Sequence, residues 1–373
     1  MADLQHLATG TEASSVAVKG LTKGYGPGGV VRALNEFTLD FPAGECTVLL
    51  GPSGCGKTTV LRSIAGLLPP DQGRIEIGSD IVFDAATGVL APPEKRRLGM
   101  VFQSYALWPH LSIADNIGYP LAAANLPKQA IQARTEAMLE WIGLVGMGGR
   151  FVHELSGGQQ QRVSLGRALV GNPRAVLFDE PLSNLDARLR ERMRLELLAL
   201  RQRAPFTSIY VTHDQLEAMT LGDRVVVMRA GTIEQVGTPE DVYKRPRTRF
   251  TADFMGIPNL VDGVVRASLP DGAVVETVLG PLRTRGWRGG WADGDRCTVA
   301  VRPTLLSISA GESDGARPGR VIRSVFQGTS TIHVIDMAGT ELTLESFSEE
   351  RHADGAAISV APVPGAVFAL LDD

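Results

Sequence analysis

Short apolar runs separated by turn residues predict the first elements of this chain. Residues 16–19 and 37–41 cluster or alternate apolar positions as strands do, and residues 46–50 form a run typical of a buried strand. A Gly-rich turn, residues 24–29, lies between the first two runs. Residues 58–67 are expected to form a helix after the third strand, ended by a Pro-Pro pair and a glycine.

The middle of the chain changes to a helical pattern. Residues 99–102 fit one more strand, and residues 128–143 place apolar side chains three and four positions apart, as an amphipathic helix does. The bare apolar run at 175–178 then indicates a central parallel strand covered on both faces. Residues 187–200 predict a helix with a solvated, charged face. A further strand and a hairpin are expected at 208–211, 224–228 and 233–236.

After residue 243 the chain breaks into short strand-like pieces punctuated by Gly, Pro and Asp, which favours a small all-β unit, either a sandwich or a barrel. The basic run at 244–249 fits a solvated hinge better than an anion-binding patch. We therefore expect an α/β domain at 15–245, with a helical subdomain at about 104–155, and a β-domain at 246–373. The strands expected in the β-domain are 261–265, 273–278, 297–301, 320–326, 331–336, 341–344 and 366–371.

Composition and charge narrow the class of protein. The 373 residues suffice for two or three domains, and 44 % hydrophobic with 21 % charged residues suit a globular protein with a full core. A net charge of −4 gives no electrostatic reason to expect nucleic acid as a partner. The three cysteines are widely spaced and odd in number, which favours a reducing compartment. We expect no secretory signal, and no apolar run reaches the ~18 residues of a membrane span.

The segment GPSGCGKT, residues 51–58, carries the first candidate chemistry. It matches the phosphate-loop pattern G-x-x-x-x-G-K-[ST], and it lies between a predicted strand and a predicted helix, as such a loop requires. Its glycines let backbone N–H groups converge on phosphate oxygens at a helix N-terminus. Lys57 is expected to reach the β- and γ-phosphates, and the Thr58 hydroxyl to bind Mg²⁺. The predicted nucleotide-binding residues here are Gly51, Pro52, Ser53, Gly54, Cys55, Gly56, Lys57, Thr58 and Thr59.

A second segment, AVLFDE at residues 175–180, supplies two carboxylates. The hydrophobic strand ends at Asp179, and Glu180 follows directly. Phosphoryl transfer to water needs a metal ion that neutralises charge and a group that orients the water. We assign the Mg²⁺ role to Asp179 and the water-orienting role to Glu180.

A third segment, LSGGQQQR at residues 155–162, is expected to place a polar turn before a helix at 159–170, and so to offer another anion site at a helix N-terminus. Together the three segments resemble the ATP-binding cassette (ABC) ATPase family over about residues 16–236. The resemblance implies a P-loop NTPase core that binds ATP and Mg²⁺. It also implies that two copies enclose two ATP molecules head to tail, closing on ATP and opening after its hydrolysis. The residues that close on the γ-phosphate held by the other copy are then Ser156, Gly157, Gly158 and Gln159.

Three single residues acquire a role only through this resemblance. Gln103 matches the family's glutamine before the helical insertion, which binds Mg²⁺ and the attacking water and senses the transporter. His213, in YVTHDQ, matches the histidine that contacts the γ-phosphate. Tyr25 matches the aromatic residue that stacks on adenine, and the loop at 183–187 matches the family's subunit-contacting loop.

Residues 101–121 and 239–263 resemble the importer branch of the family. The triplet VRP at 301–303 resembles a segment of the C-terminal β-domain of these importer subunits, which is OB-like or TOBE-like. The resemblance implies a homodimeric ATPase at the cytoplasmic face of the inner membrane, bound to integral-membrane permease subunits and served indirectly by a solute-binding protein. Polyamine or ferric iron is the favoured solute, with sugar and phosphonate left open. The alternatives are a soluble non-transport ABC ATPase, the ATPase of an exporter, and a P-loop kinase, in which LSGGQ has no evident use.

Overall fold

The structure is a computed structural model whose chain forms two compact units, divided after Pro239. The division falls within α8 (Pro239–Lys244), whereas the sequence pattern placed it after residue 245. No helix in the described part of the chain has the length and apolar character that crossing a bilayer requires. The residues that the structure describes are 13–26, 31–203, 205–286, 290–309, 315–347 and 351–371.

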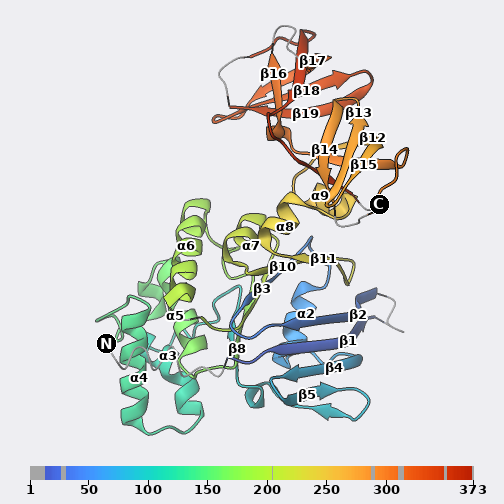
Figure 1. The fold of residues 1–373 in the computed structure, drawn as a ribbon. Helices are drawn as coiled ribbons and strands as arrows, with labels where there is room; N and C mark the ends of the chain where they lie inside the picture. Colours follow the sequence, from blue (N-terminus) through green and yellow to red (C-terminus); the bar gives the residue numbers. More distant parts are fainter. Residues whose placement is uncertain are drawn as a thin grey trace. The chain divides into compact units, whose positions relative to one another are not determined.

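A six-stranded sheet forms the centre of the first unit (Figure 1). Its order is β11-β10-β3-β9-β8-β7, with five neighbouring parallel strands and β11 antiparallel at one edge. Strands β3 and β8, which were predicted from apolar runs, and β9, which was expected as a further short strand, are buried along their whole length. The strands are β3 (Cys46–Leu50), β7 (Leu98–Val101), β8 (Ala175–Asp179), β9 (Ser208–Thr212), β10 (Arg224–Arg229) and β11 (Thr232–Gly237).

A second, antiparallel sheet has the order β2-β1-β4-β5-β6. Sequence reasoning found only its first two strands and took Gly73 as a helix terminator. Gly73 instead lies in β4 with φ 98°. The position requires glycine, because a Cβ atom there would lie 2.6 Å from the carbonyl oxygens of Lys19 and Gly20 on β1. The strands are β1 (Val16–Tyr25), β2 (Val31–Phe41), β4 (Gln72–Ile77), β5 (Asp80–Asp84) and β6 (Val89–Leu90).

Helix α2 (Lys57–Ala65) shares one hydrophobic core with both sheets of this unit. It buries Val60, Leu61 and Ile64 completely, so the helix is fixed along its whole length. Its C-cap, Gly66, has φ 80° and packs against the guanidinium of Arg96, whose Nη1 donates to the last-turn carbonyls of Ser63 and Ile64 at 2.8 Å each. The fixed helix holds the residues at its N-terminus in place.

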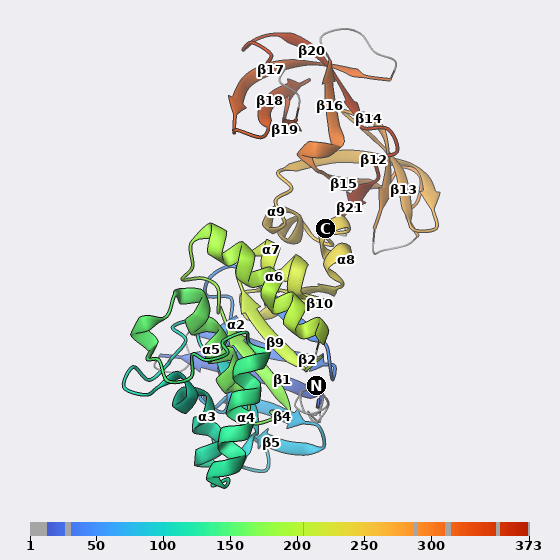
Figure 2. The ribbon, with the colours of Figure 1, turned by 90° about the vertical axis from the view of Figure 1, so that its left-hand side faces the viewer.

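The remaining helices of the first unit pack on one another and on strands of the central sheet (Figure 2). Helix α5 packs on β7 and on α3, which in turn packs on α4, while α6 and α7 contact each other and α7 contacts β3 and β9. The prediction that α5 begins at residue 159 was wrong: the helix begins at Gly157, and Ser156 is its N-cap. The helices are α3 (Ile113–Ala123), α4 (Lys128–Trp141), α5 (Gly157–Leu169), α6 (Ala187–Arg203) and α7 (Gln215–Leu221).

The second unit is all-β apart from short helical segments such as α9 (Arg249–Phe254), and of the two architectures that the sequence left open it contains a barrel, together with one five-stranded sheet. A closed barrel, β12-β13-β14-β21-β15, and a sheet, β16-β20-β17-β18-β19, share one hydrophobic core. Strands β14, β16 and β20 were missed because each is short and half-exposed. The barrel strands are β12 (Asn259–Leu269), β13 (Gly272–Thr277), β14 (Gly280–Arg285), β15 (Arg296–Val301) and β21 (Phe368–Leu370). The sheet strands are β16 (Leu306–Ser309), β17 (Arg317–Phe326), β18 (Thr331–Met337), β19 (Thr340–Ser346) and β20 (Ala357–Pro362).

Candidate functional site

The phosphate loop, residues 51–56, joins β3 to α2, and its glycines are required by close approaches of neighbouring backbone. A Cβ atom on Gly51 would lie 2.5 Å from the carbonyl oxygen of Met228, and one on Gly56, which has φ 105°, would lie 2.4 Å from that of Ala33. Gly54 has φ 81°, a conformation that strains other residues. The loop is therefore held in one shape by β10 and by β2.

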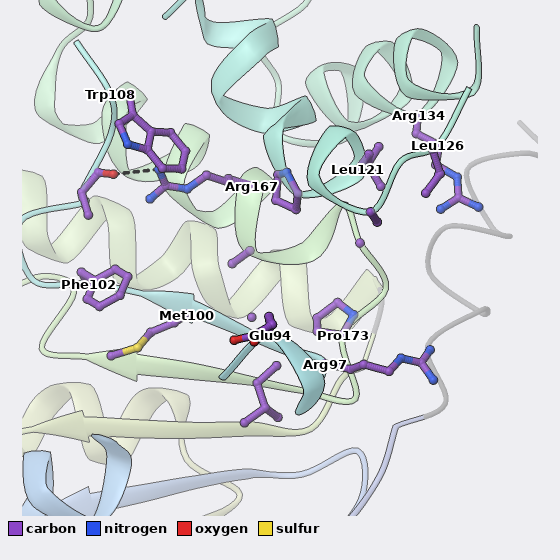
Figure 3. Close-up of a pocket in the computed structure, with 17 residues that line it drawn as sticks. Glu94, Arg97, Met100, Phe102, Trp108, Leu121, Leu126, Arg134, Arg167 and Pro173 are labelled. Atoms are coloured by element: carbon purple, nitrogen blue, oxygen red, sulfur yellow. Dashed lines mark hydrogen bonds between the residues drawn. The ribbon is translucent and has the colours of Figure 1, made fainter. Parts of the chain in front are cut away.

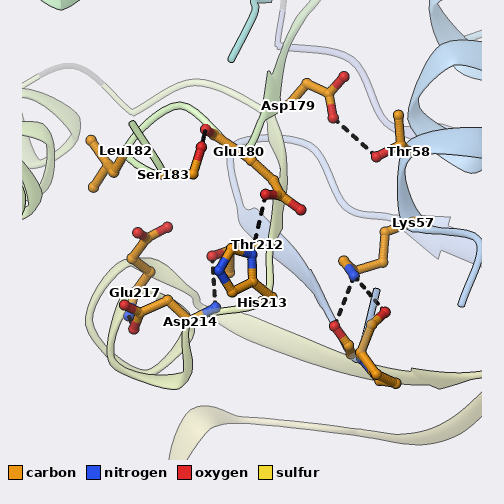
Figure 4. Close-up of polar contacts among 12 residues, drawn as sticks. Lys57, Thr58, Asp179, Glu180, Leu182, Ser183, Thr212, His213, Asp214 and Glu217 are labelled. Carbon is orange, nitrogen blue, oxygen red and sulfur yellow. Dashed lines mark hydrogen bonds and ion pairs between the residues drawn. The ribbon is translucent and has the colours of Figure 1, made fainter. Parts of the chain in front are cut away.

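Lys57 is folded back into this loop (Figure 4). Its Nζ atom donates to the carbonyl oxygens of Gly51 at 2.7 Å and Pro52 at 2.9 Å, and the residue is only 5 % exposed. The Cys55 Sγ atom lies 3.8 Å from the same ammonium. Burial raises the pKa of the Cys55 thiol, so the thiol stays protonated near neutral pH. The lysine thus places a positive charge at the centre of the loop.

Thr58 and Asp179 meet beside the loop, although they lie on α2 and β8 (Figure 4). The Thr58 hydroxyl donates to Asp179 Oδ1 at 3.1 Å. Hydroxyl and carboxylate oxygens are the hard ligands that Mg²⁺ prefers, and a Mg²⁺ site uses one or two protein groups with water and phosphate. The pair fits the metal that the sequence assigned to it.

Arg62, which the sequence analysis did not single out, completes the contacts of Asp179. Its Nη2 atom lies 3.3 Å from Asp179 Oδ2. The signal that could have revealed it is its spacing, because residue 62 lies one helical turn after Thr58 and therefore on the same face of α2.

Glu180 and His213 form a second pair, from the ends of β8 and β9 (Figure 4). The His213 Nδ1 atom lies 3.1 Å from Glu180 Oε2. Because a carboxylate only accepts hydrogen bonds, Nδ1 carries the proton in this contact, and Nε2 takes no part in it. Glu180 has φ 48°, and its backbone is fixed by a bond from its N–H to the Val211 carbonyl and by the Ser183 hydroxyl, which donates to its carbonyl at 2.9 Å.

Gln103 and Tyr25 make no hydrogen bond or ion pair with this cluster within the described residues. Gln103 follows β7 with an exposed side chain, and its carbonyl accepts from Asn184 Nδ2 at 3.0 Å. Tyr25 ends β1 rather than lying in a turn; it is 44 % exposed, with the Lys23 ammonium 6.0 Å from its ring centre. Part of the predicted turn at 24–29 lies outside the described residues.

Ser156 caps α5 in a reciprocal arrangement with Gln159. Its hydroxyl accepts from the Gln159 N–H at 3.4 Å, and the Gln159 side chain accepts from the Ser156 N–H at 2.9 Å. Gly158 is buried, and a Cβ there would lie 2.9 Å from the Met193 sulfur. Among the hydrogen bonds and ion pairs of the described residues, none joins this cap to the phosphate loop of the same chain.

Comparisons with known proteins decide which family this arrangement represents. Residues 34–183 match the family model described as ABC transporter. The spermidine/putrescine import ATP-binding protein PotA of Methylococcus capsulatus is 41 % identical over 367 residues, which cover 96 % of this chain and 93 % of the relative. The chain belongs to the ABC transporter family. It is accordingly an ABC-type ATPase, which converts ATP and water to ADP and phosphate.

Two other relatives of this ABC ATPase differ in the solute that their names give. The Fe(3+) ions import ATP-binding protein FbpC of Agrobacterium fabrum is 46 % identical over 80 % of this chain and 82 % of its own length. The trehalose/maltose import ATP-binding protein MalK of Thermococcus litoralis is 52 % identical over 64 % of each chain. The dimeric, post-hydrolysis structure of the ATP-binding cassette MJ0796 with ADP and Pi matches with a TM-score of 0.52 and 31 % identity, over 60 % of this chain and 98 % of that one. This likeness confirms the predicted ABC ATPase core.

A groove of the ABC ATPase lies along the chain just after Gln103 (Figure 3). It has a volume of about 630 Å³ and lies between β7, α3 and α5. The Arg167 guanidinium lies 4.7 Å from the centre of the Trp108 ring, while its two terminal nitrogens donate to the carbonyls of Tyr105 and Ala106. Its apolar lining includes Phe102, Trp108, Leu121 and Leu126, and its charged lining includes Glu94, Arg97, Arg134 and Arg167.

Proposed function

We propose that this ABC ATPase powers the import of a small solute by closing as a homodimer on ATP and reopening after hydrolysis. The observation that carries the proposal is the likeness to an import subunit over 93 % of that relative's length, joined to the clustering of Lys57, Thr58, Asp179, Glu180 and His213 at one edge of the sheet. Hydrolysis is a property of the family, and import comes from the names of the relatives.

The residues of the cluster divide the work on ATP. Lys57 exchanges its two loop carbonyls for the β- and γ-phosphate oxygens, since a charge-assisted bond to phosphate is stronger than one to a carbonyl. Thr58 and Asp179, together with Gln103, hold Mg²⁺, which neutralises phosphate charge when bound. Glu180 orients the attacking water, and His213 fixes the Glu180 carboxylate through Nδ1 while Nε2 faces the γ-phosphate.

A second copy supplies the rest of the pocket in this proposal. The N-terminus of α5, with Ser156 as its cap, offers backbone N–H groups and a favourable dipole to an anion. Because the cap makes no hydrogen bond with its own phosphate loop, it is available to the γ-phosphate held by the other copy, as in the proposed head-to-tail dimer. The dimeric MJ0796 structure with ADP and Pi supports this assembly. Tyr25, half-exposed at the end of β1, is assigned to the adenine ring.

The groove after Gln103 is the proposed docking site for a membrane partner. Aromatic and aliphatic side chains with flanking arginines suit a short amphipathic helix from a permease, because apolar side chains fill such a groove and charged ends pair at its rim. In this proposal the chain works at the cytoplasmic face of the inner membrane. Polyamine or ferric iron remains the favoured solute, with sugar and phosphonate as the other candidates, and a solute-binding protein acts upstream of the permease.

The docking assignment is tested with Trp108→Glu, which replaces the apolar ring in the groove by a charged carboxylate beside the Arg167 guanidinium. We expect the variant to lose recovery of integral-membrane partners from solubilised membranes while it still binds ATP. Val145→Glu is the matched control, because Val145 is 73 % exposed in the same helical region but does not line the groove. If the wild type and both variants recover membrane proteins equally, the groove is not the docking site. If the wild type recovers no membrane protein, the transport role is contradicted.

A further inference from the structure

Asp179 is a shielded carboxylate whose two oxygens have different kinds of partner. Its side chain is 7 % exposed. Oδ1 accepts from the neutral Thr58 hydroxyl at 3.1 Å, and Oδ2 accepts from the Arg62 guanidinium at 3.3 Å. Burying an ionised carboxylate costs several kcal/mol unless a charge or several donors compensate it. Arg62 provides that charge, because the Lys57 ammonium is turned toward the loop carbonyls.

The contact between Arg62 and Asp179 is weak enough for another cation to replace the guanidinium at the carboxylate. A single nitrogen makes the contact, at the long end of the hydrogen-bond range, and the Arg62 side chain is 53 % exposed. A structural arginine of this chain looks different: Arg96 is 1 % exposed and donates to three carbonyls. Arg62 can therefore swing toward water when another cation neutralises Asp179.

We propose that Arg62 is an internal counterion of Asp179 that competes with Mg²⁺ and so sets the magnesium concentration at which the protein binds ATP. The inference rests on the proposed function, in which Thr58 and Asp179 hold the metal. Arg62 lies one turn after Thr58 on α2, so both reach the same carboxylate from one rigid helix. Without metal the guanidinium stabilises the shielded charge; with metal it repels the ion and gives up its own contact. Arg62 is a positioning residue, since it acts through Asp179.

The test is a magnesium titration of the binding of a fluorescent, non-hydrolysable ATP analogue to the full chain. Arg62→Gln removes the charge, and we expect the half-saturating Mg²⁺ concentration to fall about three- to tenfold. Arg62→Met is a second neutral variant, for which we expect the same fall in the half-saturating Mg²⁺ concentration, and it replaces Arg62→Gln if that variant does not fold. Arg62→Lys keeps the charge and is expected to keep the wild-type value within about twofold. The thermal midpoint without metal should fall for the neutral variants only.

Arg74→Gln is the matched control. Arg74 is 41 % exposed and pairs with the similarly shielded Asp84 at 3.6 Å and with Glu76, in a different sheet from β3, the strand that leads into the phosphate loop. Its loss should lower the thermal midpoint and leave the magnesium titration unchanged. A neutral Arg62 variant with the wild-type or a higher magnesium requirement would overturn the inference.

Asp179→Asn separates failure of the inference from failure of the proposed function. If this variant binds the analogue with the same magnesium dependence as the wild type, the metal assignment itself is wrong, and the counterion inference falls with it. If Asp179→Asn loses the dependence while the neutral Arg62 variants titrate like the wild type, the metal site stands and only the counterion role of Arg62 is overturned.

Discussion

At the scale of single residues, the site depends on Glu180, whose backbone is held by hydrogen bonds from neighbouring elements. Glu180 has a left-handed backbone at φ 48°, a conformation that costs a non-glycine residue about 1–2 kcal/mol. Bonds from the Glu180 N–H to Val211 and from Ser183 to the Glu180 carbonyl hold it there. The carboxylate then reaches His213 at 3.1 Å. Strain at this position is consistent with a residue whose direction matters more than its local stability.

Glu180→Gln is expected to trap an ATP-bound dimer. The amide keeps the shape of the side chain and can still accept from His213, but it lacks the charge that orients the water, so turnover should fall at least about 100-fold. Phosphate release and gel filtration with ATP measure both effects. Glu196→Gln is the control, because Glu196 forms a half-buried ion pair with Arg162 between α6 and α5, away from the Glu180 carboxylate, and the change should not affect turnover. A Glu180→Gln protein that remains monomeric and hydrolyses ATP normally would refute the assignment.

At the scale of elements, α5 is tied to the segment that follows β7. Tyr105 and Ala106 both have positive φ, 60° and 48°, and α5 holds their carbonyls: Arg167 donates to each, and the Ser164 hydroxyl donates to Tyr105 at 3.0 Å. The same helix begins at the Ser156 cap. Helix α5 therefore connects the segment that follows β7 with the Ser156 cap at its own N-terminus.

Arg167→Met is expected to loosen this connection. Two carbonyls lose a charged donor, which costs about 2–3 kcal/mol in the free energy of unfolding. Urea unfolding measures the loss, and hydrogen exchange should rise in the peptide that contains Tyr105 and Ala106. Arg188→Met, at an exposed position of α6, serves as the control and should stay within about 0.5 kcal/mol of the wild type. Unchanged exchange in the Arg167 variant would show that the segment is held by other contacts.

At the scale of the whole molecule, the second unit carries a buried polar group within its own core. His333 on β18 is fully buried, and its Nδ1 atom lies 2.9 Å from the Ser324 hydroxyl, which donates to the His352 carbonyl. Nδ1 must therefore donate to Ser324, and Nε2 has no hydrogen-bond partner among the described residues. Burial, and the nearby His352, lower the pKa of His333.

This pKa predicts that the second unit loses stability in acid. An unfolded histidine binds a proton near pH 6.5, whereas folded His333 stays neutral to a lower pH, so the unfolded chain binds more protons and the free energy of unfolding falls as pH drops below about 6.5. The slope is at most about 1.4 kcal/mol per pH unit for one proton. Thermal melts between pH 7.5 and 5.5 should show the decrease, and His333→Leu should flatten it. An identical pH slope in the variant would contradict the prediction.

The sequence alone determined the features of this ABC ATPase that depend on near neighbours in the chain. The buried strands β3 and β8 were predicted from short apolar runs, because a strand covered on both faces carries mostly apolar side chains. The phosphate loop was found from its glycines, because its backbone admits few other residues. Each of these signals is contained within a few consecutive residues.

Only the tertiary structure decided which distant residues meet. Strand β4 pairs with β1 and β5 pairs with β4, and the contacts of Asp179 with Thr58 and Arg62 join residues more than 100 positions apart. The reason is physical: a carboxylate at the end of a strand looks the same in the sequence whether it is solvated or shielded. Its partners are chosen by the packing of α2 against the sheet, which local sequence patterns do not encode.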